Sequence, residues 1–168
     1  PDSARMHLAV GSSLAIVVVT SIRSYFGHKR HDAVDESLLR GWLIAVPAGA
    51  LLASAAAAYM SSGMLRAVFA VVCILIALKL LFGKDSWRLG TDLPGNPLRA
   101  VVGAAIGFLS TLMGIGGGVL NNTFMTAYGR PIHQAVATSA GIGMLIAIPG
   151  FLGYIWAGWG QADLPPFS

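Results

Sequence analysis

Charged side chains are scarce in this sequence, since Asp, Glu, Lys and Arg make up only 11% of its 168 residues. Soluble domains carry charge on about 25% of their residues, and a chain this short has to cover a large surface with polar groups. Hydrophobic residues reach 55%, and the mean hydropathy is +0.71. The composition therefore argues against a soluble fold and predicts an all-α integral membrane protein.

Cysteine is nearly absent as well. Cys73 is the one cysteine of the sequence, so no disulfide can form within the chain. With one cysteine and four scattered histidines, neither a metal site nor a cofactor such as an iron–sulfur cluster is expected. The long apolar stretches contain no Asp or Glu and no recognisable nucleophile–base set, so we do not expect an enzyme.

Basic residues outnumber acidic ones, which gives a net charge of +4. Lys and Arg are confined to a few connecting segments, with three in residues 28–40 and four in residues 79–99. This pattern is typical of membrane orientation and of contact with anionic lipids, and it places both segments in the cytoplasm. A continuous basic face is missing, so nucleic-acid binding is not expected.

Stretches with little or no charge define the expected spans. They cover residues 6–22, 41–65, 67–83, 100–129 and 131–162. Because a bilayer crossing needs about 20 apolar residues, we expect about five transmembrane helices.

The most informative stretch is residues 114–118, where four of five residues are glycine. Each glycine weakens a helix by about 1 kcal/mol relative to alanine, so the sequence predicts a broken helix. At membrane depth, a broken backbone is tolerated only where protein or a water-filled cavity covers it. The free N–H groups of the next helix attract anions there, and glycine lets a ligand approach the backbone closely.

Neutral hydrogen-bond donors surround this glycine run in the sequence. Ser110 and Thr111 precede it, while further amides and hydroxyls follow it or begin the first and last spans. Such donors suit a desolvated oxyanion that must later leave. The predicted substrate-binding residues are Gly114, Gly116, Gly117, Gly118, Asn121, Asn122, Thr138, Ser139, Ser12 and Ser13.

A second interpretation of the glycines remains open. Small residues in membrane helices often serve close helix packing, as expected of a structural or assembly subunit. A phosphate-binding P-loop is excluded, because no Gly-Lys-[Ser/Thr] follows the run.

An internal similarity suggests a duplicated unit. Residues 7–13 (His-Leu-Ala-Val-Gly-Ser-Ser) resemble residues 133–139 (His-Gln-Ala-Val-Ala-Thr-Ser), 126 positions later, and seven of 22 aligned residues are identical. The predicted division is a first repeat at 1–91, a turn-rich linker at 92–97 and a second repeat at 98–168.

With the same offset, the first-repeat partner of the glycine run would lie before residue 1. The sequence would likewise stop where the second helix of the second repeat should begin. We therefore expect a fragment that lacks one broken span at the front and two spans at the back. The two copies would be parallel if residues 100–129 cross the membrane, which the low charge around Arg130 favours. They would be inverted if that stretch turns back.

The Gly-Ile-Gly-Gly-Gly run at 114–118, the motif Pro-x-His-x-Ala-Val-Ala-Thr-Ser at 131–139 and its first copy at 7–15 resemble the TauE/SafE-type sulfite exporter family. The resemblance implies about eight spans built from a duplicated four-helix unit. It also implies export of sulfite, sulfonates or other small sulfur oxyanions by a multi-pass protein of the bacterial inner membrane. Many members carry proline where this chain has Asn-Asn-Thr at 121–123, which suggests a more polar pocket.

The expected partners are therefore a small anionic substrate and membrane lipids. The sequence leaves open the exact substrate, the coupling ion and whether the protein forms a homo-oligomer.

Overall fold

The computed structural model describes residues 5–31, 33–82, 90 and 95–158. Every regular element within these residues is an α-helix, which confirms the predicted all-α class. Residues 92–94 of the predicted linker lie outside the described ranges, so the division into two repeats stays a prediction. The helices are α1 (Arg5–Lys29), α2 (Glu36–Gly41), α3 (Ala45–Tyr59), α4 (Ser62–Phe82), α5 (Asn96–Met113), α6 (Gly118–Ala127) and α7 (Ile132–Gly158).

Three of these helices are long and apolar enough to cross a membrane, namely α1, the Ser62–Lys79 part of α4, and α7. Two shorter apolar helices, α3 and α5, accompany them. These five helices overlap the five stretches where spans were expected, and α6, whose ten residues are too few for a crossing, occupies the second half of the 100–129 stretch.

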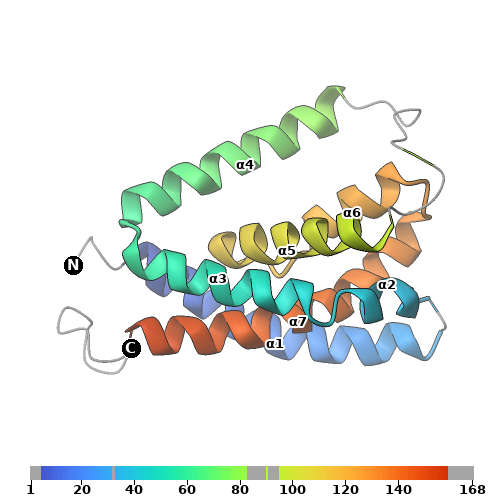
Figure 1. The fold of residues 1–168 in the computed structure, drawn as a ribbon, viewed down its shortest axis with the longest axis horizontal. Helices are drawn as coiled ribbons and strands as arrows, with labels where there is room; N and C mark the ends of the chain where they lie inside the picture. The colour runs from blue at the N-terminus through green and yellow to red at the C-terminus, as the bar shows by residue number, and fades with distance from the viewer. Residues whose placement is uncertain (1–4, 32, 83–89, 91–94, 159–168) are drawn as a thin grey trace.

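The bundle is held by close contacts of α3 with α5 and α7, and of α1 with α7. A Cβ atom at Gly49 would collide with the carbonyl of Ala104, and one at Gly107 would collide with the carbonyl of Val46. The backbones of α3 and α5 therefore touch, as at other membrane interfaces formed by small residues. Figure 1 shows that α4 lies apart from this pack, and its apolar side chains beyond Leu65 are largely exposed.

The two copies of the His-x-Ala-Val motif run in opposite directions. Gly11 of α1 lies against Tyr154 of α7, while Tyr25, further along α1, lies against Gly141, which is earlier in α7. Helices α1 and α7 are therefore antiparallel, and Figure 1 shows them side by side with opposite courses. If the two motifs are copies of one unit, as the sequence predicts, the antiparallel helices make that repeat an inverted one.

The glycine run turns the chain back, so the expected crossing of residues 100–129 is wrong. Helix α3 runs parallel to α5, because Trp42 just before α3 bonds to Arg99 near the start of α5, whereas Ser54 and Thr111, near the ends of the two helices, both contact Gly150 of α7. The α2–α3 segment also runs parallel to α7, since Leu39 lies at Gly141 and Ser54 lies at Gly150 and Gly153.

Helix α6 runs the other way. Gly117 at its start lies against Ile146 of α7, whereas Asn121, one turn later, bonds to Ser139. Because α5 follows the direction of α7 and α6 opposes it, α5 and α6 form a re-entrant pair. Figure 1 accordingly shows the α6–α7 connection at the same end of the bundle as α2 and the start of α5. The helix ends and connections that carry Lys29, Arg40, Arg99 and Arg130 thus lie at one end of the bundle, which agrees with the positive-inside rule.

Candidate functional site

Three left-handed glycines make the turn between α5 and α6. Gly114, Gly116 and Gly117 have φ angles of +69°, +67° and +78°. Side chains with a Cβ disfavour this region, so the backbone itself requires glycine at these positions. The N–H of Gly114 donates to the carbonyl of Thr111 and the N–H of Ile115 donates to that of Ser110, both at 3.2 Å. These two bonds form a Schellman motif that ends α5.

The turn is enclosed between the two long antiparallel helices. The Ser13 hydroxyl of α1 donates to the carbonyl oxygen of Gly114 at 2.6 Å. A Cβ at Gly116 would collide with Val17 of α1, and one at Gly117 would collide with Ile146 of α7. Because these contacts fall near the middle of α1 and α7, the broken backbone lies deep in the bundle and is covered by protein.

Two buried hydroxyls beside the turn have no hydrogen-bond partner. Ser110 and Thr111 are both 0% exposed, and the Oγ of Ser110 and the Oγ1 of Thr111 are unpaired. The Ser110 Oγ lies 3.7 Å from the position that a Cβ of Gly117 would take. Leaving such a group unpaired costs about 1–3 kcal/mol, so these hydroxyls are suited to a polar ligand.

The start of α6 adds backbone donors to the same region. The first intrahelical bond runs from the Asn121 N–H to the Gly117 carbonyl at 2.9 Å, which leaves the N–H groups of residues 118–120 without intrahelical partners. The helix dipole places partial positive charge at these groups. Apart from the backbone of α6 itself and the adjacent residues, nothing lies within 4 Å of the position that a Cβ of Gly118 would take, so there is open space at the first residue of α6.

Three of the predicted binding residues meet one turn beyond the glycines. The Asn121 Nδ2 donates to the Ser139 Oγ at 2.7 Å, and that hydroxyl donates to the Asn122 Oδ1 at 2.7 Å. Asn121 is completely buried, and its Oδ1 has no partner. This amide–hydroxyl cluster, defined as Asn121, Asn122 and Ser139, lies one turn along α6 from the glycine turn.

Two predicted binding residues do not join this region. Thr138 is buried, but its hydroxyl accepts the backbone N–H of Asp35 at 2.9 Å. Asp35 in turn caps α2 by accepting the Leu38 N–H at 3.0 Å. Ser12 is exposed on α1, on a different face from Ser13. Helical geometry explains both results, because neighbouring residues point about 100° apart.

Helix α2 is therefore a docked element and not a solvated loop. The exposed Glu36 carboxylate lies 3.3 Å from the Lys29 ammonium at the end of α1, and this hydrogen bond lowers the pKa of that carboxyl. The pattern Asp-x-x-Leu at residues 35–38, with an N-cap residue before an apolar one, was the available signal for this cap.

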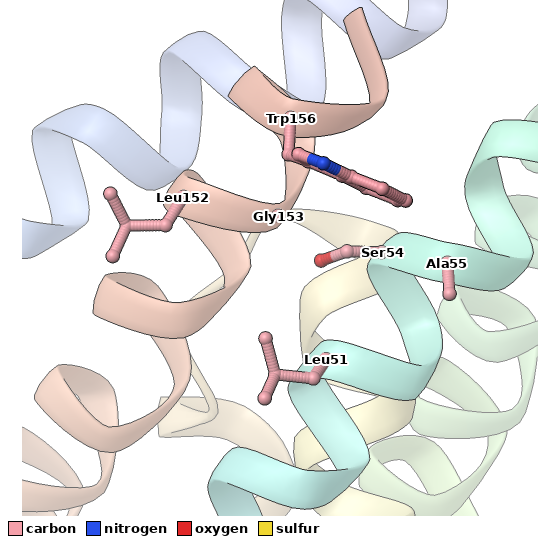
Figure 2. Close-up of a pocket in the computed structure, with 6 residues that line it drawn as sticks. All are labelled: Leu51, Ser54, Ala55, Leu152, Gly153 and Trp156. Atoms are coloured by element: carbon pink, nitrogen blue, oxygen red, sulfur yellow. The ribbon is translucent and has the colours of Figure 1, made fainter.

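A separate apolar groove of about 290 Å³ lies between α3 and α7 and is shown in Figure 2. It has no charged side chain in its lining, and the Trp156 ring at its rim is 76% exposed. Such a surface suits lipid chains better than an anion. Its lining residues are Leu51, Ser54, Ala55, Leu152, Gly153 and Trp156.

Comparisons with known proteins agree with this architecture. A probable membrane transporter protein of Haemophilus influenzae is 30% identical over 100% of this chain and 64% of its own length. A probable membrane transporter protein of Methanocaldococcus jannaschii is 26% identical over 94% of this chain and 58% of its own length. The Bacillus subtilis protein YdhB, also named a probable membrane transporter protein, is 30% identical over 92% of this chain and 65% of its own length.

The chain thus spans about three fifths of the length of these relatives. No solved structure matches it. The family described as sulfite exporter TauE/SafE matches residues 4–167, which is nearly the whole sequence. With its apolar helices and its glycine turn, the chain belongs to the TauE/SafE sulfite exporter family.

Proposed function

We propose that this chain carries the substrate site of a membrane transporter that exports a small sulfur oxyanion, such as sulfite or an organosulfonate. The anion would lie between the Ser110 and Thr111 hydroxyls and the N-terminus of α6. The observation that carries the proposal is the pair of fully buried, unpartnered hydroxyls beside a left-handed glycine turn. The family description and the names of the relatives support the class of function.

The chemistry of this region suits transport better than tight binding. Between Arg99 and Arg130 the sequence contains no charged side chain, so the donors at the turn are neutral hydroxyls, amides and backbone N–H groups. Charge-assisted bonds from a buried arginine would be roughly twice as strong and would slow release. A site of neutral donors can strip water from an oxyanion and still let it leave.

The packing interpretation explains other glycines of this chain better than those at the turn. Gly49 and Gly107 have ordinary helical backbones and bring α3 and α5 into contact. Gly114, Gly116 and Gly117 instead need positive φ angles, which helix packing alone does not require. The hypothesis of a purely structural subunit therefore explains the glycines of the α3–α5 interface but does not explain those of the turn.

The test is uptake of labelled sulfite by proteoliposomes that contain the full-length protein, with sulfonates, thiosulfate and sulfate as competitors. Ser110→Ala removes an unpartnered hydroxyl and leaves no new unpaired group, so the variant should insert and fold normally. We expect its uptake to fall about tenfold, the effect of one lost hydrogen bond of about 1.4 kcal/mol.

The matched control is Thr20→Ala, because Thr20 is exposed and bonds only to its own helix. It should transport like the wild type. Folded wild-type protein that takes up none of these anions above empty vesicles would contradict the proposal and favour the packing interpretation.

A further inference from the structure

The orientation of the Asn121 carboxamide is fixed by its neighbours. Its Nδ2 donates to the Ser139 Oγ at 2.7 Å and also lies within hydrogen-bond reach of the Met125 Sδ at 3.3 Å and the Ala135 carbonyl oxygen at 3.5 Å. The Ser139 hydroxyl cannot donate back, because its single proton goes to the Asn122 Oδ1 at 2.7 Å. A flipped amide would place its Oδ1 against the Ala135 carbonyl oxygen, and two acceptors repel each other. The Nδ2 side therefore faces Ala135.

This arrangement leaves the Asn121 Oδ1 as a fully buried acceptor without a donor. The backbone N–H of Asn121 donates to the Gly117 carbonyl, which places Asn121 one helical turn after the last glycine of the turn. Near the turn there is therefore a buried hydrogen-bond acceptor as well as hydrogen-bond donors. An anion whose oxygens can only accept hydrogen bonds satisfies Ser110 and Thr111, but it meets the oxygen of Asn121 with the wrong polarity.

We infer that the transported species carries a polar hydrogen and donates it to the Asn121 Oδ1. This inference rests on the proposed function. For sulfite, the species would be the O-protonated monoanion (HOSO2⁻) rather than the dianion. Among sulfonates, those with a hydroxyl or ammonium group near the sulfonate would be preferred over simple alkyl sulfonates.

The inference also fits the side-chain partners of Asn121, none of which is a titratable group. The charged or titratable groups on the elements packed against it are Tyr128 on α6, His133 and Tyr154 on α7, Arg99 on α5 and Asp35 before α2. None of them bonds to Asn121, and the predicted spans contain no carboxylate. A proton that crosses on the substrate itself needs no such residue.

The first test compares two sulfonates that do not titrate near neutral pH and differ by one hydroxyl. At pH 7.5, 2-hydroxyethanesulfonate should inhibit labelled sulfite uptake by the full-length protein about fivefold more strongly than ethanesulfonate, the effect of one neutral hydrogen bond. In Asn121→Leu the two inhibitors should become equal. In Thr126→Ala, whose hydroxyl bonds only to its own helix, the fivefold ratio should persist.

The second test needs no variant and therefore does not depend on the folding of Asn121→Leu. Uptake at constant total sulfite should follow the hydrogensulfite fraction between pH 6 and 9, after subtraction of the flux into empty vesicles. It should be unchanged when sodium is replaced by potassium.

Three results would overturn the inference while leaving the proposed function intact. The first is uptake that follows the fraction of sulfite dianion. The second is equal inhibition by both sulfonates in the wild type, which would mean that a bound water donates to the Asn121 Oδ1. The third is uptake that requires sodium at every pH, which would mean that a cation binds the Asn121 Oδ1. Absence of uptake of any sulfur anion would contradict both proposals.

Discussion

At the scale of single residues, the glycines of the turn illustrate how local geometry decides function. Gly117 has a φ of +78° and a Cβ position that overlaps Ile146, whereas the neighbouring Gly118 has no positive φ and open space around it. Both residues look alike in the sequence. The first is required by the fold, and the second leaves room beside the N–H groups that we assign to the anion.

This difference predicts opposite effects for the same substitution. Gly117→Ala should lower stability by at least about 1–2 kcal/mol, because a left-handed alanine is strained and its methyl meets Ile146. Gly118→Ala should fold at least as well as the wild type, since alanine favours helix, but its methyl should reduce sulfite uptake. Thermal unfolding in detergent and the uptake assay separate the two effects. A stable Gly117→Ala protein would contradict the assigned turn.

At this scale the sequence indicated several of the residues that come together around the turn, and which of them bind a substrate stays a prediction. A run of four glycines indicated a broken backbone, and Asn121, Asn122, Ser139 and Ser13 do meet at or near it. The pairing of Thr138 with Asp35 was not foreseeable, because it depends on how a distant loop folds back onto α7.

At the scale of elements, α2 is the clearest addition from the structure. Its Leu38 is completely buried, its cap residue Asp35 bonds to Thr138, and the indole Nε1 of Trp42 after it donates to the Arg99 carbonyl at 2.7 Å. This short helix therefore closes one end of the bundle, and its anchor Thr138 directly precedes Ser139 of the amide–hydroxyl cluster.

Loss of its anchors should loosen α2 without unfolding the bundle. Thr138→Val removes the acceptor of the Asp35 N–H, and Asp35→Ala removes a helix cap of about 1 kcal/mol. Both should speed amide hydrogen exchange in residues 35–42 and leave α1 and α7 protected. Ser37→Ala, at an exposed position, is the control and should change nothing. Unchanged exchange in Thr138→Val would show that the bond is not an anchor.

The direction of α6 could not be read from the sequence. Glycine adopts positive and negative φ with similar ease, so four glycines predict a break without saying whether the chain continues or returns. The low charge around Arg130 suggested a crossing, and the antiparallel contacts of Gly117 and Asn121 with α7 corrected it.

At the scale of the whole molecule, the two motif copies lie in inverted, neighbouring helices. Transporters built this way place their substrate between the copies and at broken helices, near the middle of the membrane. The turn between α1 and α7 has this position. The offset of 126 residues predicted a duplication, and the contacts of Gly11 with Tyr154 and of Tyr25 with Gly141 add that the two motif-bearing helices are antiparallel.

The re-entrant pair makes a topological prediction. In a Cys73→Ala background, His31→Cys and Pro131→Cys should react with an impermeant thiol reagent from the same side of the membrane, and Ser61→Cys from the opposite side. All three positions are exposed. Labelling of Pro131→Cys together with Ser61→Cys would mean that residues 100–129 cross the membrane after all.

The central claim, that an oxyanion binds at the glycine turn, is tested most directly by anomalous diffraction from crystals of the full-length protein soaked in selenite. Selenite has the shape and charge of sulfite, and selenium can be located without ambiguity. The account predicts a peak whose oxygens lie within about 3 Å of the Ser110 Oγ and the first N–H groups of α6. That peak should be lost in Ser110→Ala and kept in Thr20→Ala. Selenium found only beside basic residues at the ends of the bundle, with the turn empty, would contradict it.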